Sequence, residues 1–334
     1  MAEPLKIGIL RLCDAAPVIV AQDQGFFEAH GLRAEISVEP SWANIADKLG
    51  YGLLDAAVML PPLALACAMG LRGRKTALAV PMSLSANGNA IVLSNAWKDW
   101  QATDAAGLKA ALAAGAPKPR LAVVHGYSTH DLLLRYWLAA EGMDPERDVE
   151  ITVLPPAETI SGLAAGAIDG FCAGAPWGHV AARAGLGVIA AFSQDIWQNH
   201  PEKCLAVRAD FAARHEGSVL ALLAALRQAC AFCAQPENRG ALASLLSHAA
   251  YLDLPADLLG QALAPEEGGP QFAEPYPHPA HARWFAEQLV RWHKAGADAI
   301  GAAETLYRPD LFQRSGGGFA APREEIFCKN TRLI

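Results

Sequence analysis

Charge is scarce in this chain. Asp, Glu, Lys and Arg together make up 18% of its 334 residues, and the net charge is −7. Without a basic surplus the chain is not a general nucleic-acid binder, so we expect no direct nucleic-acid partner. The 52% hydrophobic content excludes disorder and predicts a globular protein with a sizeable core. A small anionic ligand is not excluded, because a few donors in a dry cleft outweigh a diffuse, screened charge.

The sequence also lacks a disulfide or metal-binding framework. Its cysteines are odd in number and scattered, which suits a reducing compartment: Cys13, Cys67, Cys172, Cys204, Cys230, Cys233 and Cys328. Cys230 and Cys233 form a C-x-x-C pair within a helical pattern, with no second pair at metal-ligand spacing. We therefore predict buried helix cysteines, no metal and no cofactor. Carboxylates paired for acid–base catalysis are missing as well, and we expect no enzyme activity.

Export and membrane signals are missing too. The chain enters the apolar run 7–10 and then Arg11 without a basic segment followed by a long apolar one. We expect a cytoplasmic location, or a periplasmic one if an export signal has been removed. Prolines and polar residues interrupt the apolar stretches 56–71 and 76–97, so neither predicts a membrane span.

What the chain does have is a regular alternation of strand and helix patterns, which predicts α/β structure with parallel sheets. A polar turn at 83–89 indicates a crossing into a second lobe, and a strand at 205–207 indicates the return. We predict two lobes hinged around a ligand cleft, lobe 1 being 1–86 plus 205–334 and lobe 2 being 87–204. The expected strands are 6–10, 34–38, 56–59, 76–81, 90–93, 121–124, 149–153, 168–172, 187–190 and 205–207. The expected helices are 17–27, 42–49, 61–69, 104–114, 128–141, 157–166, 176–185, 217–234, 237–248, 257–263 and 279–295.

Two sequence features connect this pattern with a ligand. The runs 52–57 and 166–171 share the pattern Gly-x-apolar-Asp-small before a strand, which favours duplicated lobes, although such turns are common by chance.

Ser128 precedes a long amphipathic segment and follows an apolar run with a Gly turn. This pattern predicts a capped helix whose free N–H groups attract anions, with His130 in its first turn.

Several segments resemble the nitrate/bicarbonate solute-binding proteins of the NrtA/CmpA type. The resemblance runs in unbroken order over residues 5–210 and is weaker after about 235. It rests on the segments Asp14-Ala15-Ala16-Pro17, 24–32, 40–43, 52–57, 87–91, 129–131 with 134–140, 170–172 with 176–177, and 200–203. It implies a two-lobed type 2 periplasmic-binding-protein fold with a hinged cleft.

The resemblance also implies ligand contacts. They would fall on Trp42, on the turn Asn87-Gly88-Asn89 with Asn89 foremost, on His130 and on Lys203. Asn89 stands where the transporters carry Gln, which implies a tighter or water-bridged pocket. A cation at Lys203 favours a monovalent oxyanion, whereas the resemblance implies an acidic residue and a metal at this place in the bicarbonate binders. Bicarbonate is therefore unlikely.

Each of these residues has a structural alternative. Trp42 could be a packing residue, His130 a cap or solvent-facing group, and Lys203 a solvated lysine in a polar loop before a strand. Asp14 is at least as well explained as a helix cap, and His125 as a support for the loop under His130.

Three functions stay open from the sequence. The missing export signal favours similarity to the cytoplasmic nitrate/nitrite sensor NasS, which would hold a NasT-like RNA-binding antiterminator until the anion releases it. The alternative is the substrate-binding protein of a nitrate ABC importer. The fold also resembles the thiamine-pyrimidine synthases, but the chain lacks their cysteine-rich cluster, so an enzyme is the weakest of the three.

Overall fold

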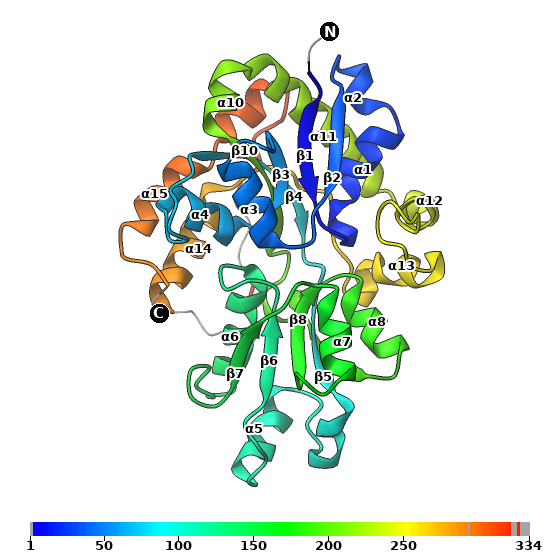
Figure 1. Ribbon diagram of the computed structural model, residues 1–334, viewed down its shortest axis with the longest axis vertical. Coiled ribbons are helices and arrows are strands. Elements are labelled where there is room, and N and C mark those ends of the chain that lie inside the picture. Colours follow the sequence, from blue (N-terminus) through cyan, green and yellow to red (C-terminus); the bar gives the residue numbers. More distant parts are fainter. Residues whose placement is uncertain (1–2, 293, 322–325, 328–334) are drawn as a thin grey trace. The chain divides into compact units, whose positions relative to one another are not determined.

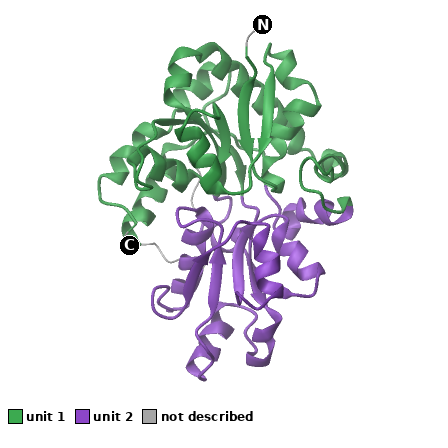
Figure 2. Ribbon diagram, in the orientation of Figure 1, with its two compact units in different colours: residues 1–86, 201–256, 271–323 green, residues 87–200, 257–270, 324–334 purple. Residues whose placement is uncertain are grey.

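The computed structural model describes residues 3–292, 294–321 and 326–327. The chain divides into two compact units, coloured separately in Figure 2. Unit 1 comprises 1–86, 201–256 and 271–323, and unit 2 comprises 87–200, 257–270 and 324–334. Each unit contains a mixed sheet covered by helices, and each is described by itself below.

The sheet of unit 1 has the order β2-β1-β3-β10-β4 among the described residues. Strands β1 (Leu5–Ile9), β2 (Ala34–Val38) and β3 (Ala56–Met59) are parallel, as the alternating pattern predicts. Strand β10 (Pro201–Arg208) runs antiparallel to β3 and to β4 (Leu78–Ala86). Cys204 pairs with Met59, so residue 203 lies just beyond the carboxyl end of β3.

Helices α1 (Ala16–Asp23), α3 (Trp42–Gly50) and α4 (Pro61–Met69) follow β1, β2 and β3 (Figure 1). The later helices of this unit begin with α10 (Ala209–Arg214) and the long α11 (Glu216–Cys233). They continue with α12 (Arg239–Leu246), α14 (Pro279–Arg291), α15 (Ala299–Leu306) and α16 (Pro309–Arg314). Among the described residues, α11 alone is long and apolar enough to cross a membrane. It packs on α1 and α2 (Phe26–Ala29), so we assign it to the core of unit 1.

The sheet of unit 2 has the order β7-β6-β8-β5-β9 in the described part of the chain. Strands β6 (Arg120–Val123), β7 (Glu150–Val153) and β8 (Gly170–Gly174) are parallel. Strands β5 (Asn89–Ser94) and β9 (Gly187–Phe192) complete it, with β5 antiparallel to β8. Its helices are α5 (Ala105–Ala113), α6 (Thr129–Ala140), α7 (Glu158–Ala164), α8 (Trp177–Arg183), α9 (Ser193–Ile196) and α13 (Ala256–Ala262).

The shared Gly-x-apolar-Asp pattern has the same structural role in both units. The Asp55 carboxylate accepts from the backbone N–H of Lys6 at 3.0 Å, and the Asp169 carboxylate accepts from that of Arg120 at 2.8 Å. The glycines that open the two runs both have positive φ, Gly52 at 71° and Gly166 at 64°. Each run is thus a left-handed turn followed by an aspartate that ties one strand to its neighbour.

The predicted boundaries were wrong in several places. Residues 201–204 belong to unit 1, and 257–270, with most of α13, belong to unit 2. Residues 83–86 form the end of β4 instead of a turn. They pair with β10, and the N–H groups of Ser83 and Ala86 donate to the carbonyls of Pro275 and Gln271. The helix predicted over 17–27 is broken at Gly25, whose φ is 70°.

Candidate functional site

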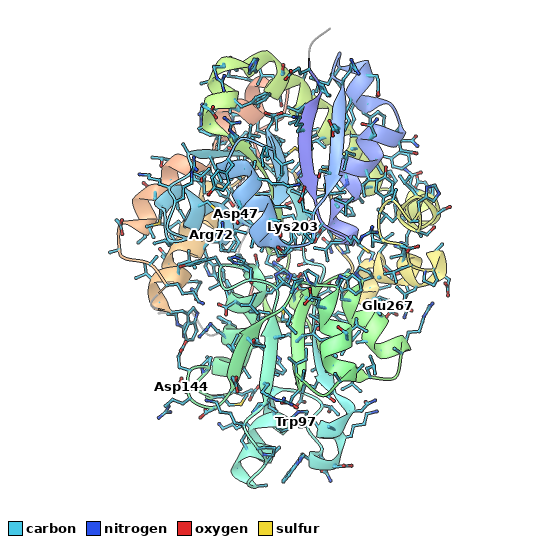
Figure 3. The ribbon with its side chains drawn as sticks, viewed as in Figure 1. Asp47, Arg72, Trp97, Asp144, Lys203 and Glu267 are labelled. Carbon is cyan, nitrogen blue, oxygen red and sulfur yellow. The ribbon has the colours of Figure 1, made fainter. Side chains whose placement is uncertain are left out.

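Three polar elements meet at one edge of the unit 1 sheet. Asp14 lies in the 3-10 turn after β1, Trp42 begins α3 after β2, and Lys203 lies on β10 beside the end of β3. The carboxyl ends of parallel strands are where open α/β sheets bind their ligands. Lys203, labelled in Figure 3, is therefore a strand residue and not the loop lysine that the sequence predicted.

Lys203 is held by two carboxylates. Its Nζ lies 2.8 Å from Asp14 Oδ2 and 2.6 Å from Glu202 Oε1. All three side chains are buried, with Lys203 and Glu202 fully inaccessible and the Asp14 side chain 3% exposed. Buried charges of this kind persist only when they are paired. Asp14 is thus a partner of Lys203 and not a helix cap, since its side chain caps neither the 3-10 turn nor α1.

The ionisation of this cluster follows from its burial and its charges. Burial raises the pKa of Asp14 above its ordinary value, against the opposing attraction of Lys203. Burial alone would lower the pKa of Lys203, but Asp14 and Glu202 outweigh it and raise that pKa. A cation between two carboxylates therefore keeps its proton, whereas Asp14 is protonated more readily than an exposed aspartate.

Trp42 stands beside the lysine. The Lys203 ammonium lies 5.4 Å from the centre of the Trp42 ring, within cation–π range. Ser41 caps α3 by accepting from the N–H of Asn44 at 3.2 Å, which fixes the helix start that carries Trp42. The buried indole Nε1 of Trp42 has no hydrogen-bond partner among the described residues. A buried donor without a partner is costly and points to a ligand or water.

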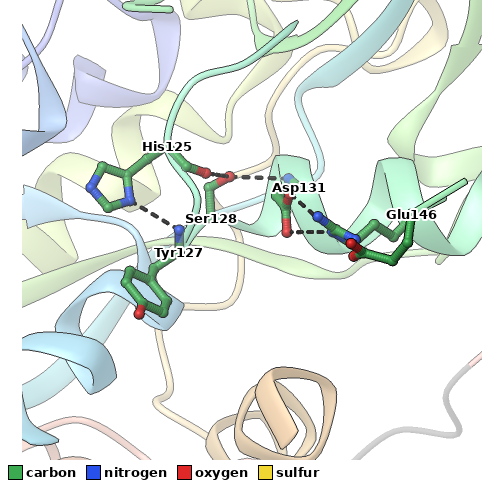
Figure 4. A network of polar contacts seen from close by, with 6 residues as sticks. His125, Tyr127, Ser128, Asp131 and Glu146 are labelled. Carbon is green, nitrogen blue, oxygen red and sulfur yellow. Dashed lines mark hydrogen bonds and ion pairs between the residues drawn. The ribbon is translucent and has the colours of Figure 1, made fainter. Parts of the chain in front are cut away.

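In unit 2 the predicted helix start is confirmed. Ser128 is the N-cap of α6. Its Oγ accepts from the N–H of Asp131 at 3.0 Å and donates to the His125 carbonyl at 2.6 Å (Figure 4). His125 Nδ1 accepts from the N–H of Tyr127 at 3.0 Å, so His125 supports the loop as predicted. Asp131 pairs with Arg135 at 3.1 Å.

His130 and the turn Asn87-Gly88-Asn89 lie at one edge of this sheet. His130 follows β6 and is fully buried. Asn89 pairs with Gly174 at the carboxyl end of β8, and the Gly88 carbonyl accepts from the N–H of Ala175 at 2.7 Å. Asn87 adopts a φ of 57°, and neither atom of its buried amide has a hydrogen-bond partner in the part of the chain described. The edge therefore offers buried polar groups to a ligand.

The structure thus brings the predicted residues into two sets, each within its own unit. Trp42 and Lys203 form one set, and Asn87, Gly88, Asn89 and His130 form the other. Sequence reasoning missed Glu202, misjudged Asp14, and did not single out His179. The buried His179 Nε2 lacks a partner among the residues described, and burial lowers its pKa.

The cysteine prediction is confirmed for Cys230 and Cys233, which are buried in α11. Burial raises the pKa of Cys230 to about 12, which disfavours the thiolate that a metal would need. Cys328 lies outside the described residues.

With this geometry in view, the chain was compared with known proteins. A family model described as the NMT1-like family matches residues 2–247. The chain belongs to the NMT1-like family. Within it, the nitrate/nitrite-binding protein NrtA of Synechocystis is 31% identical over 98% of this chain and 79% of that protein. The bicarbonate-binding protein CmpA of Synechococcus elongatus is likewise 31% identical, over 98% of this chain and 81% of that protein.

Other relatives are longer. The nitrate import ATP-binding protein NrtC of Synechocystis is 34% identical over 92% of this chain, but over 49% of its own length. The chain therefore spans about half the length of the first curated relatives that it matches.

A solved relative has the same fold. The crystal structure of the periplasmic nitrate-binding protein NrtA from Synechocystis superposes with a TM-score of 0.89 at 30% identity, over 94% of this chain and 88% of that one. The alkanesulfonate-binding protein SsuA from Xanthomonas superposes with a TM-score of 0.69 at 16% identity, over 94% of this chain and 99% of that one. At this identity the likeness shows the fold alone. The predicted resemblance and the α/β two-lobed periplasmic-binding-protein class are confirmed.

Proposed function

We propose that this protein binds a small oxyanion of the nitrate or bicarbonate class as the substrate-binding component of an importer. The observation that carries the proposal is the occurrence of two sets of buried polar residues, each at the edge of a sheet. The chain that carries them matches the nitrate-binding NrtA over 98% of its own length. The proposed ligand contacts of unit 1 are Trp42 and Lys203. Those of unit 2 are Asn87, Gly88, Asn89 and His130.

The expectation against bicarbonate loses its physical basis. It contrasted a cation at Lys203 with an acidic residue there in the bicarbonate binders, but Lys203 is paired with two acidic residues, Asp14 and Glu202. Relatives named for nitrate and for bicarbonate are equally similar, at 31% identity. Both anions therefore belong in the proposal, with nitrite beside nitrate.

NrtA and CmpA are named as binding proteins and NrtC as an ATP-binding import protein. These names favour a binding protein over an enzyme. They also favour the importer over the NasS-like sensor, and the NasT-like antiterminator partner stays a prediction. The cytoplasmic location likewise stays a prediction, since the solved relative is periplasmic.

One observation still favours a sensing role as the second candidate. The chain is 34–38% identical to the ATP-binding import proteins, in matches that cover about half the length of each protein. It is 31% identical to the separate binding proteins. A segment similar to this chain is thus part of those ATP-binding import proteins, and in this second candidate anion binding to such a segment regulates a partner. Recovery of the native protein from the periplasmic fraction of its cells would exclude this candidate. Recovery from the cytoplasm bound to an RNA-binding antiterminator would exclude the importer.

Calorimetric titration tests the primary proposal. Nitrate, nitrite and bicarbonate are added in turn to the purified protein and to His130→Asn. We expect saturable binding of at least one anion, and its weakening in the variant. His215→Asn is the matched control, because His215 lies between α10 and α11 of unit 1 and belongs to neither set. Binding of an alkanesulfonate with no heat from any of the three anions would overturn the proposal.

A further inference from the structure

The starting observation is a charge count in unit 1. The cluster holds one ammonium, Lys203, and two carboxylates, Asp14 and Glu202. With every group ionised, its net charge is 1 − 2 = −1. All three side chains are buried, so solvent screens this charge poorly. An anion that approaches Lys203 therefore meets a net negative cluster and not a free cation.

The second observation is the state of the Asp14 carboxylate. Its Oδ2 faces Lys203 at 2.8 Å, while the buried Oδ1 has no hydrogen-bond partner among the described residues. A buried carboxylate oxygen without a donor is unfavourable. Two changes would satisfy it: a proton on Oδ1 itself, or a hydrogen donated by a ligand. With a proton on Oδ1, Asp14 can donate a hydrogen bond to an oxyanion. Without that proton, Asp14 can accept a hydrogen bond from an oxyanion that carries a hydrogen.

We propose that Asp14 sorts oxyanions by whether they carry a hydrogen, so that nitrate binds with uptake of one proton by the protein and bicarbonate binds without it. The inference rests on the proposed function and names a residue that sets its specificity. For nitrate, one proton passes from solvent to Asp14 Oδ1, and the new O–H donates to a nitrate oxygen. For bicarbonate, the ligand's own O–H donates to Asp14 Oδ1, and the carboxylate stays ionised.

The surrounding groups agree with this assignment. Glu202 is the other charged group on Lys203. The neighbouring thiols are Cys13, which feels the charge of Asp14, and Cys204, which feels those of Lys203 and Glu202. Burial raises the pKa of both thiols, so they stay neutral. Burial also raises the pKa of Asp14, which brings protonation nearer to neutral pH. From α3 the neighbouring side chain is the uncharged Trp42.

Proton counting by calorimetry tests the inference on the unaltered protein. Nitrate and bicarbonate are each titrated near neutral pH in Tris and in bis-tris, which differ in ionisation enthalpy and contain no oxyanion. The difference in binding heat between the two buffers gives the protons taken up. We expect about one proton for nitrate and about none for bicarbonate. Nitrate affinity should fall by up to tenfold per pH unit above the pKa of Asp14, while bicarbonate affinity should not.

The variant Asp14→Asn removes the titrating group and keeps its size. When nitrate binds to this variant, we expect the protein to take up about no protons. Its affinity for nitrate should become independent of pH. Asp55→Asn is the matched control: Asp55 is an aspartate of the same unit that accepts from the Lys6 backbone and lies outside the cluster. It should keep the behaviour of the unaltered protein.

The outcomes separate the two proposals. If neither anion binds, the proposed function fails. If nitrate binds without proton uptake, or if bicarbonate takes up as many protons as nitrate, the inference fails and the proposed function stands. The titrations of the unaltered protein decide this even if Asp14→Asn does not fold.

Discussion

Lys203 Nζ lies 2.8 Å from Asp14 Oδ2, and this ion pair joins the turn after β1 to the strand β10 inside unit 1. A second carboxylate, Glu202, lies 2.6 Å from the same nitrogen. The lysine that resembles a ligand contact in the nitrate-binding proteins is therefore also a structural charge of this unit. Removing the lysine leaves two buried carboxylates unpaired, whereas removing Asp14 leaves the lysine paired with Glu202.

Lys203→Met should destabilise the protein strongly. The substitution keeps the length of the side chain but leaves two buried carboxylates without a cation, and breaking a buried pair in this way costs about 3–5 kcal/mol. Urea unfolding of the variant and of Lys75→Met measures the loss. Lys75 is an exposed lysine of the same unit, and its substitution should change the free energy of unfolding by less than about 0.5 kcal/mol. Equal effects at the two positions would contradict the ion-pair assignment.

Asp14→Asn should change how stability depends on pH. Because burial raises the pKa of Asp14, the folded chain binds this proton more tightly than the unfolded chain. Asp14 therefore contributes most stability at low pH, and that contribution is lost as pH rises above the ordinary aspartate pKa of about 3.9. The stability of Asp14→Asn relative to the unaltered protein should consequently rise with pH. Urea unfolding between about pH 4 and about pH 8 checks the sign, and parallel curves would contradict it.

Most of the fold could be predicted from the sequence because its signals are local. The β/α alternation, the Ser128 cap and the Gly-x-apolar-Asp turns depend on neighbouring residues, and the structure reproduces them. The role of Asp14 could not be predicted in this way. Its partner Lys203 reaches it only because β10 pairs with β3, a relationship between distant segments that neither neighbourhood encodes. On its other side β10 pairs with residues 83–86, which suggest a loop in the sequence and instead form the end of strand β4.

Ser128→Ala should destabilise unit 2 through the start of α6. The Ser128 hydroxyl accepts from the N–H of Asp131 and donates to the His125 carbonyl, so its loss leaves both groups unsatisfied. Loss of an N-cap costs about 1 kcal/mol, with a range of about 0.5–2. Ser128→Asp, which keeps an acceptor, should recover part of this free energy. Thermal unfolding of the two variants gives the comparison, and equal Tm values for Ser128→Ala and the unaltered protein would contradict the cap.

Trp42→Phe should separate anion binding from stability. The indole Nε1 has no partner among the described residues, so removing this N–H sacrifices no hydrogen bond of the ligand-free protein, while the Phe ring keeps a π-face near Lys203. Because the Phe ring is smaller than the buried indole, we expect the free energy of unfolding to fall by about 1–2 kcal/mol, the cost of a partly filled site. Anion affinity should nevertheless fall about tenfold, because a hydrogen bond to a charged group contributes about 1.5–3 kcal/mol. Titration with nitrate and with bicarbonate measures the affinities. Trp97→Phe is the control, since Trp97 is buried in unit 2 and lies in neither predicted set. Unchanged affinity in Trp42→Phe would show that the indole N–H points at water and not at the anion.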